Sequence, residues 1–414
     1  MRAYVWTLAA LGVAVTANLA RAQGGLTPPG APAPSMKTLA QVEPRIPITN
    51  LPFVISQPGS YYATTNLTLS VAGTGIVVNA NDVSIDLNGF QLNGPGASSS
   101  IGVLQQPWFR NLTLVRGNLS GWGQCAVSAD GSAGRFAFLT LSGNASGLYA
   151  GPKSQISDCT ASDSSFPAFF SLIFGFMAAE SCTLQRCAAI ANTGNNMAIG
   201  FYVLSNSIVS DCVASGNAGS TYAYGFSLSA GCTASRCVSD NNSGGSDTGG
   251  GGIGFLLQEH CRLSDAQARF NSHYGIYAAA RCQLSGCLAA TNSAKDGFYV
   301  GTGGIVRDCI ATANHEAGID VTGDNNLVTG CNSSGNRAAG IYVKGHRNRI
   351  EDNQCAYNDW GVYFDPSGLT DYNLAVRNSA FSNTSGNYGI GIGNILAPID
   401  SYRAFTNAWS NFSY

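Results

Sequence analysis

The sequence predicts an all-β fold, a solenoid whose short strands stack coil upon coil along one axis. Between about residue 192 and residue 365, an asparagine is followed after a short gap by a glycine that opens a small apolar strand. The asparagines are Asn192, Asn217, Asn242, Asn271, Asn292, Asn314, Asn336 and Asn358, and the glycines are Gly200, Gly225, Gly254, Gly275, Gly297, Gly318, Gly340 and Gly361. Over the last five repeats the period is 21 or 22 residues. A fixed period of this length indicates coils that bury their apolar faces only against their neighbours.

Within one coil, short apolar segments alternate with turn-forming residues. In the coil that begins at Asn326, apolar residues follow at 327–328 and again at 341–343, with Gly, Asn and Ser between them. This pattern is typical of about three strands separated by turns, and helical spacing at three and four residues is absent. About 390 residues would otherwise suggest two or three globular domains, but a solenoid grows along one axis without that limit.

These repeats resemble the right-handed parallel β-helix repeats of the pectate-lyase-like superfamily. The resemblance implies three parallel sheets wound into a prism, with about 13–14 coils of roughly 22–29 residues each. Weaker copies of the repeat occur at residues 75–78, 101–103, 147–150, 175–178 and 389–392. The β-helix is therefore expected to span residues 60–395.

Both ends of the chain carry other signals. Arg2, an apolar run over residues 3–20 and the small residues Ala20 and Ala22 predict a signal peptide over residues 1–22, hence a secreted or periplasmic protein. Residues 23–34 are rich in Gly, Pro and Ala and indicate a spacer. Because open solenoid ends must be covered, we expect an N-terminal cap at 35–59, with a short helix at 35–42, and a C-terminal cap at 396–414.

Composition excludes several classes of partner. Charged residues make up only 11% of the chain and the net charge is −2, so no basic track for nucleic acid is present. After the signal peptide no apolar run is long enough to span a membrane, since the longest, residues 166–179, is interrupted by Pro167 and Gly175. The oligomeric state stays open.

The most conspicuous residue types follow the repeat and are interpreted as architecture. Seven cysteines occupy one position of successive coils, Cys159, Cys187, Cys212, Cys237, Cys287, Cys309 and Cys331, and Cys182, Cys232, Cys261 and Cys282 occupy a second. Parallel Cβ vectors at coil spacing favour buried thiols over disulfides, and a single-file row does not converge on a metal. Stacked asparagines are expected to hydrogen-bond between coils, and the glycines to allow close backbone approach.

The face most suited to binding carries a row of tyrosines. Alternation turns the second residue after each glycine outward, which gives the column Tyr149, Met177, Tyr202, Ser227, Leu256, Tyr277, Tyr299, Asp320, Tyr342 and Tyr363. Tyrosine rings offer an apolar face and a hydroxyl, so Tyr277, Tyr299, Tyr342 and Tyr363 are candidate ligands for a polysaccharide or glycan surface. High strand propensity of tyrosine explains the row equally well. Longer connections between residues 192 and 254, and an apolar insertion at 164–174, could wall a groove beside this face.

Charged residues gather where Asp320 interrupts the tyrosines. Lys344 and Asp365 lie on the same face two residues after the column, and His315 and His346 lie at its margins. These five residues are candidates for acid–base catalysis. No cofactor is required for this chemistry, although the carboxylates leave Ca²⁺ as an option. A solvated charge patch is the alternative interpretation.

The superfamily resemblance implies a polysaccharide lyase or glycoside hydrolase. The sequence lacks the Asn-Thr-Asp, Asp-Asp and Gly-His-Gly motifs of polygalacturonases, and a clear set of calcium-binding acids with an arginine, as in pectate lyases, is missing. Three hypotheses remain: binding of extracellular polysaccharide along the tyrosine face, catalysis as a lyase or hydrolase, and a structural or adhesive rod.

Overall fold

The computed structural model describes residues 43–166, 172–245, 251–367, 370–400 and 407–414. The chain divides into two units, Met1–Arg45 and Ile46–Tyr414. In the first unit Glu43 and Arg45 form an ion pair at 2.8 Å. The predicted signal peptide, the spacer and the short helix at 35–42 lie outside the described residues.

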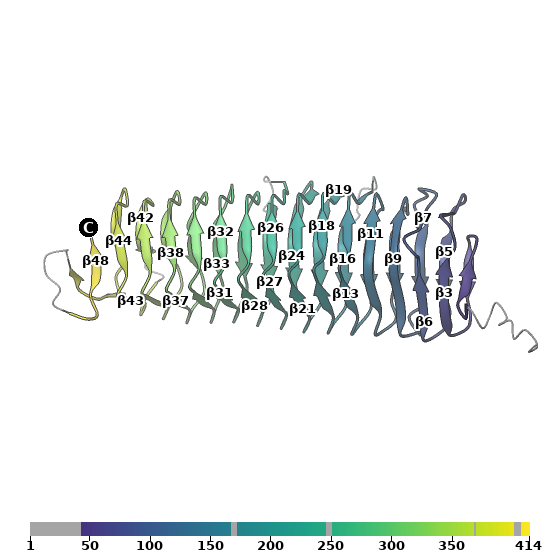
Figure 1. Ribbon diagram of the computed structural model, residues 1–414. Coiled ribbons are helices and arrows are strands. Elements are labelled where there is room, and N and C mark those ends of the chain that lie inside the picture. Colours follow the sequence, from purple (N-terminus) through teal and green to yellow (C-terminus); the bar gives the residue numbers. More distant parts are fainter. Residues whose placement is uncertain (1–42, 167–171, 246–250, 368–369, 401–406) are drawn as a thin grey trace, which may run out of the picture. The chain divides into compact units, whose positions relative to one another are not determined.

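One sheet of 15 parallel strands receives one strand from each coil of the second unit, as Figure 1 shows. In stacking order its strands are β2 (Phe53–Ile55), β5 (Thr74–Val78), β8 (Ile101–Gln105), β10 (Cys125–Ala129), β12 (Leu148–Ala150), β16 (Leu172–Ala178), β20 (Met197–Val203), β24 (Tyr222–Leu228), β27 (Gly251–Leu257), β30 (Ile276–Ala278), β33 (Phe298–Val300), β36 (Ile319–Val321), β39 (Ala339–Val343), β42 (Trp360–Phe364) and β45 (Gly386–Gly389). Fifteen levels agree closely with the predicted number of coils. In the described part of the chain, no helix has the length and apolar character to cross a membrane.

A second sheet of 30 parallel strands consists of two stacks that share the long strands β9 (Leu112–Ser120) and β11 (Arg135–Ser142). The first stack contains β1 (Ile46–Ile48), β3 (Gly59–Ala63), β6 (Val83–Asp86), β13 (Gln155–Ser157), β17 (Thr183–Gln185), β21 (Ile208–Ser210), β25 (Thr233–Ser235), β28 (Arg262–Ser264), β31 (Gln283–Ser285), β34 (Ile305–Arg307), β37 (Leu327–Thr329), β40 (Arg349–Glu351), β43 (Leu374–Val376) and β46 (Ile395–Leu396). The second contains β4 (Leu67–Thr68), β7 (Gln91–Asn93), β14 (Thr160–Ser162), β18 (Ala188–Ile190), β22 (Val213–Ser215), β26 (Val238–Asp240), β29 (Gln267–Arg269), β32 (Leu288–Ala290), β35 (Ile310–Thr312), β38 (Asn332–Ser334), β41 (Gln354–Ala356), β44 (Ser379–Phe381), β47 (Ile399–Asp400) and β48 (Asn411–Ser413). The 15-stranded sheet and these two stacks are the three faces that the resemblance implied.

Bends of one left-handed residue separate the two stacks. Asp308, between β34 and β35, has φ 54°, and Arg116 and Phe138 have φ 58° and 57° in the middle of β9 and β11. A left-handed residue reverses the local twist, so the chain turns a corner without a loop. The two stacks therefore remain one hydrogen-bonded sheet while facing different directions.

The interior is filled by ladders of identical residues. Phe176, Phe201, Phe226 and Phe255 stack with ring centroids 5.2, 4.7 and 4.7 Å apart and are completely buried. All 13 cysteines lie in the described residues, buried and free of disulfides, as the parallel Cβ argument predicts. Burial raises the pKa of Cys355 to about 12, so this thiol stays protonated and behaves as a small apolar group.

The asparagine ladder has the predicted hydrogen bonds. Asn314 Nδ2 donates to Asn336 Oδ1 at 3.0 Å, and Asn314 Oδ1 accepts from Asn292 Nδ2 at 2.9 Å. The Asn314 side chain also accepts from the Asn292 backbone amide at 3.2 Å and donates to the Ala289 carbonyl at 3.1 Å, so its amide group is satisfied although buried. The glycine column is equally constrained, because a Cβ on Gly297 would lie 2.6 Å from Asn314 Nδ2.

The longer coils do not form free loops where they are described. Their extra residues pair into a small sheet of β15 (Ser165–Phe166), β19 (Thr193–Gly194) and β23 (Ala218–Gly219), and they lengthen β16, β20, β24 and β27 to seven residues. Residues 167–171 of the apolar insertion, and residues 246–250 with Asp247 in the glycine-rich segment, lie outside the described residues.

Strands also extend into the ranges expected to form caps. β1 and β2 lie within residues 35–59 and pair with β3 and β5. At the other end Asn411 continues an asparagine ladder by accepting from Asn378 Nδ2 at 3.1 Å, and Arg377 lies over the Trp409 ring at 5.1 Å. Tyr402 and Phe405 lie outside the described residues.

Candidate functional site

The register of the 15-stranded sheet confirms the tyrosine column. Tyr277 pairs with Tyr299, Tyr299 with Asp320, Asp320 with Tyr342, and Tyr342 with Tyr363, always between adjacent coils. The four tyrosines are half-buried, while the residues on either side of each point into the core. The predicted outward alternation is therefore correct.

A second outward column, which alternation does not predict, lies three residues before the first. Strict alternation would turn Tyr274 inward, but the alternation is interrupted where Gly275 and Ile276 are buried one after the other, and Tyr274 contacts both Tyr277 and Tyr299 edge-to-face at 5.6 Å. From β16 to β42 the second column reads Phe174, Ile199, Tyr224, Ile253, Tyr274, Asp296, Ala317, Ala339 and Trp360. The outer face therefore carries two columns, and the second has large apolar or aromatic side chains from Phe174 to Tyr274 and again at Trp360.

The tyrosine rings stack on one another rather than lying flat on the sheet. Tyr277 and Tyr299 are parallel to within 5° at a centroid distance of 4.3 Å. Coil spacing brings equivalent side chains to stacking distance, so each ring covers its neighbour's face. A ligand above this pair would meet ring edges and hydroxyl groups, which differs from the face-on sugar stacking expected from the sequence.

A hollow of about 360 Å³ lies beside this pair, over β24, β27 and β30. Four tyrosines line it, together with apolar and polar groups: Tyr222, Tyr224, Tyr274, Tyr277, Ile253, Leu256, Gln258 and His273. His273 Nδ1 is buried without a hydrogen-bond partner in the described residues, and burial lowers the pKa of this imidazole. An aromatic wall with a few polar groups is typical of a small-molecule or sugar site of this size.

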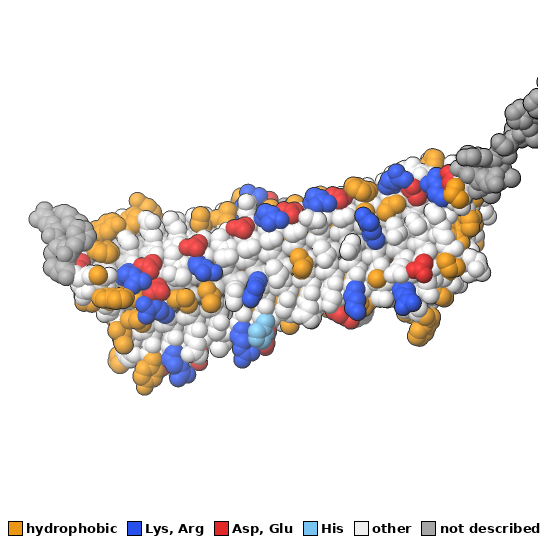
Figure 2. Space-filling model, turned by 60° about the horizontal axis from the view of Figure 1, so that its bottom comes forward, with side chains coloured by type: hydrophobic (Ala, Val, Ile, Leu, Met, Phe, Trp, Pro, Cys, Tyr) orange, Lys and Arg blue, Asp and Glu red, His pale blue; other side chains and the backbone are white. Residues whose placement is uncertain are grey.

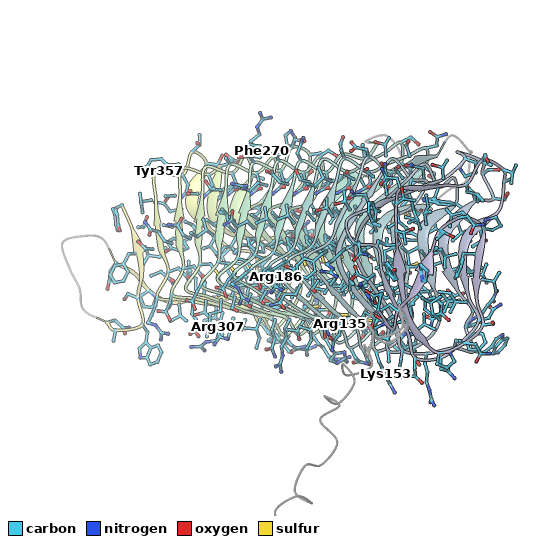
Figure 3. All side chains as sticks on the ribbon, turned by 45° about the vertical axis from the view of Figure 1, so that its right-hand side comes forward. Arg135, Lys153, Arg186, Phe270, Arg307 and Tyr357 are labelled. Atoms are coloured by element: carbon cyan, nitrogen blue, oxygen red, sulfur yellow. The ribbon has the colours of Figure 1, made fainter. Side chains whose placement is uncertain are left out.

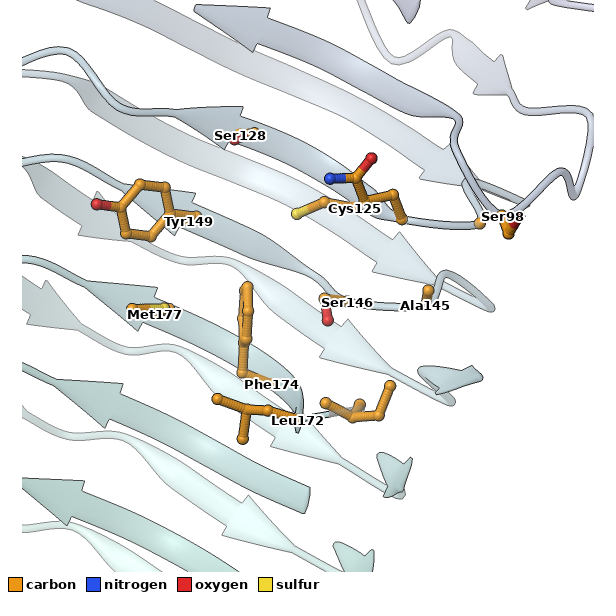
Figure 4. Close-up of a pocket in the computed structure, with 12 residues that line it drawn as sticks. Ser98, Cys125, Ser128, Ala145, Ser146, Tyr149, Leu172, Phe174 and Met177 are labelled. Atoms are coloured by element: carbon orange, nitrogen blue, oxygen red, sulfur yellow. The ribbon is translucent and has the colours of Figure 1, made fainter. Parts of the chain in front are cut away.

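A second hollow, of about 450 Å³, lies on the same face over β10, β12 and β16. Figure 4 shows Met177, Phe174 and Leu172 in the lower part of the view, Tyr149 at the left and Cys125 in the upper part, all lining this hollow. Burial raises the pKa of the Cys125 thiol to about 12. Both hollows are therefore lined by members of the two outward columns.

The structure brings two of the candidate residues, Asp320 and Lys344, into contact, but Asp320 is not exposed. Lys344 Nζ lies 2.8 Å from Asp320 Oδ2 and 4.5 Å from the centroid of the Tyr342 ring, and Asp320 is only 4% exposed. Burial raises the pKa of Asp320, and the hydrogen bond from Lys344 opposes that shift. Asp320 Oδ1 is buried without a partner among the described residues, which is costly for a carboxylate.

Asp296, which the sequence analysis did not single out, lies one coil before Asp320 in the second column. Its Oδ1 accepts a hydrogen bond from the Ala317 amide at 2.8 Å, and the residue is 2% exposed. Burial and the nearby charge of Asp320 raise the pKa of Asp296 to about 7. Two neighbouring carboxyl groups in different environments, one paired with an ammonium group and one not, can hold different protonation states.

The remaining candidates are divided between this cluster and its surroundings. Tyr342 donates a hydrogen bond to Asp365 Oδ2 at 3.1 Å, and Trp360 lies 4.9 Å from Tyr363. The backbone amide of Ser367 lowers the pKa of Asp365. His315 is exposed at the turn before the sheet, and His346 is hydrogen-bonded to Asp371 instead of to Asp320 or Asp365.

Among the residues that the structure describes, no group of three or more His, Cys, Asp or Glu side chains is placed to hold a metal ion. Lys344 occupies one oxygen of Asp320, and Lys295 pairs with Glu316 at 2.7 Å.

The 30-stranded sheet has a different outer surface. At its left-handed bends, acidic and basic residues alternate between coils and pair, as in Asp158–Arg186 at 2.6 Å and Asp211–Arg236 at 2.7 Å. Figure 2 shows basic and acidic side chains side by side along one face, and Figure 3 shows Arg186 and Arg307 below Phe270 and Tyr357, which lie at the upper edge of that view. Where these ion pairs form, the exposed charges neutralise each other locally.

Comparison with known proteins defines the class. The model of a right-handed beta helix region matches residues 99–255 and 251–394. The chain therefore belongs to the right-handed beta-helix family. No curated protein matches it.

Solved structures are similar at low identity. The A-module of Azotobacter vinelandii mannuronan C-5 epimerase AlgE4 is 14% identical with a TM-score of 0.44, covering 81% of this chain and 90% of that one. For the Dettilon tailspike protein the values are 12%, 0.39, 82% and 62%, and for the periplasmic alginate epimerase AlgG 12%, 0.36, 82% and 77%. At these scores the likenesses carry no argument about activity.

Proposed function

We propose that this protein binds a polysaccharide along the outer face of the 15-stranded sheet. The observation that carries the proposal is the tyrosine-lined hollow over β24, β27 and β30, directly beside the stacked pair Tyr277 and Tyr299. Hydroxyl groups, Gln258 and the unpartnered His273 Nδ1 supply hydrogen-bonding groups, and the ring edges supply apolar contact. A repeating ligand suits a face that repeats every coil.

Tyrosine variants test this proposal. Tyr277→Ala and Tyr299→Ala remove the stacked pair, and the affinity for a glycan identified on a glycan panel is expected to fall by about tenfold or more, as for aromatic residues at the centre of an interface. Tyr357→Ala is the matched control, because Tyr357 is 66% exposed at a bend away from this sheet. Equal affinities in all four proteins would contradict the proposal.

A second candidate function is cleavage of the bound polysaccharide by the acid cluster. Asp296 would act as general acid and Asp320 as the ionised partner held by Lys344, which is the division of roles expected for carboxyl groups with different pKa values. A depolymerisation screen for reducing-end or unsaturated products tests it, and Asp320→Asn should abolish product formation while glycan binding persists.

We also propose that the protein is secreted or periplasmic, on the strength of residues 1–22. N-terminal sequencing of the protein recovered outside the cytoplasm should begin at Gln23. A mature protein that still begins at Met1 would contradict this.

A further inference from the structure

We propose that the glycan bound by this face is uncharged, and that polyuronates are excluded from it. The inference rests on the proposed polysaccharide-binding function and names the chemical class of its ligand. It follows from the charge of the outer face, counted over the two outward columns and over a third column two residues after the tyrosines.

Between β10 and β42 these three columns contain few charged residues. They are Asp130, Asp296, Asp320, Asp365 and Lys344. The single ammonium group is already bound to Asp320 Oδ2 at 2.8 Å. Over the described coils, the three columns therefore hold two partly exposed carboxyl groups, Asp130 and Asp365, and two buried ones, Asp296 and Asp320, with no unpaired cation among them.

The turns that border the columns do not reverse this balance. Lys295 is paired with Glu316 at 2.7 Å, and Arg337 is exposed one coil from Asp359. The turns that follow the third column add four carboxyl groups and three cations: Glu180, Glu259, Asp324 and Asp371, and Lys153, Arg281 and Arg347. Counting the turns on both sides, ten carboxyl groups face six cations, and protonation of Asp296 would still leave nine against six.

A polyuronate carries one carboxylate on every sugar ring. Binding it here would place its carboxylates against a surface with more carboxyl groups than cations, whose exposed cations, among them Lys153, Arg337 and Arg347, lie in the bordering turns outside the columns. Like charges placed side by side cost several kcal/mol in protein interfaces. A neutral glycan avoids this cost and still meets the hydroxyl groups of Tyr222, Tyr274 and Tyr277, together with Gln258. The hollow is thus matched to hydroxyl-rich, uncharged rings.

Calorimetric titration with two sets of oligosaccharides of equal length tests the inference. The neutral probes are gluco-, manno- and xylo-oligosaccharides, and the acidic probes are oligogalacturonate and oligomannuronate. At low ionic strength we expect at least one neutral probe to bind at least about tenfold more tightly than either acidic probe. The difference should narrow at high ionic strength, because salt screens the repulsion.

A charge-addition variant makes the test specific to this face. Thr322→Lys places an ammonium group in the third column, one coil before Lys344, and should raise the affinity for acidic probes by about two- to fivefold. As the matched control, Thr329→Lys adds the same charge to the 30-stranded sheet and should leave the affinity for acidic probes unchanged.

The outcomes separate the two proposals. Acidic probes that bind as tightly as neutral ones, or more weakly as salt is added, would overturn the inference while polysaccharide binding stands. If no probe of either class binds, the proposed function itself fails.

Discussion

The 15-stranded sheet carries an aromatic ladder on each face, and the two ladders are built differently. Inside, Phe176, Phe201, Phe226 and Phe255 continue without interruption and are fully buried. Outside, Tyr277 and Tyr299 stack at the same coil spacing, but Asp320 follows them, and polar atoms such as its Oδ1 are buried without partners in the described residues. Packing explains the inner ladder completely, whereas the outer one contains features that folding alone does not require.

The largest expected loss of stability follows from a substitution in the inner phenylalanine ladder. Phe226→Ala removes a fully buried ring between two stacked neighbours and should lower the free energy of unfolding by about 3–5 kcal/mol. Tyr277→Ala, on the outer face of the same sheet, should cost far less because its ring is half exposed. Denaturant unfolding followed by circular dichroism measures the stability of both variants. Equal losses of stability would contradict the claim that the inner ladder is required for folding and the outer one is not.

The asparagine ladder should show the next largest effect. Asn314→Ala leaves Asn292 Nδ2 and the Ala289 carbonyl without their partners inside a buried corner. Each unsatisfied buried group costs about 1–3 kcal/mol, so the destabilisation should approach that of the phenylalanine variant. Asn314→Asp is the matched comparison, since it retains acceptor oxygens but loses the donated bonds. Denaturant unfolding measures this loss, and an unfolding midpoint that Asn314→Ala leaves unchanged would show that the asparagine ladder is not required for stability.

The outer face should respond to pH through Asp296. Its pKa of about 7 in the folded protein lies above the ordinary value of 3.8, so the folded state holds a proton that the unfolded state loses. The contribution of this residue to stability is therefore greatest below about pH 4, declines as pH rises to about 7, and is constant above that. Asp296→Asn keeps the acceptor for the Ala317 amide and removes the titration.

The measurement is the difference in melting temperature between Asp296→Asn and the wild type across this range. We expect the variant to gain relative stability between about pH 4 and 7, with each pKa unit corresponding to about 1.4 kcal/mol. Parallel curves for the two proteins would mean that Asp296 titrates as an ordinary carboxyl group.

The smallest effect is expected on the 30-stranded sheet. Arg186→Ala breaks the exposed ion pair with Asp158, and the unfolding midpoint should not change measurably because water screens such pairs. Glycan affinity should also be unchanged. A clear loss of either property would show that the charged bends contribute more than local neutralisation.

Sequence periodicity was sufficient for the fold and for the inner ladders. A 22-residue period with alternation assigns Phe298, Tyr299 and Val300 to inward, outward and inward positions, and the register bears this out. Repeat alignment also places Lys344 and Asp320 on the same face, and the structure adds the ion pair between them at 2.8 Å.

The other features of the candidate site depend on local geometry that the in–out alternation of a strand does not determine. Two successive buried residues, Gly275 and Ile276, interrupt the alternation and leave Tyr274 on the outer face, where strict alternation places it inside. The burial of Asp296 depends on the Ala317 amide of the next coil, and His346 is held by Asp371, a residue 25 positions later in the chain. A glycine directly after a large side chain, repeated in several coils, was the available signal for the second column.

The most direct test of the central claim is a crystal structure of the protein with the neutral oligosaccharide that it binds most tightly. The sugar is predicted to occupy the hollow over β24, β27 and β30 and to contact Tyr277 or Tyr299. An oligosaccharide bound instead on the 30-stranded sheet, for example along the Asp158–Arg186 bends, would contradict the assignment of function to the tyrosine face.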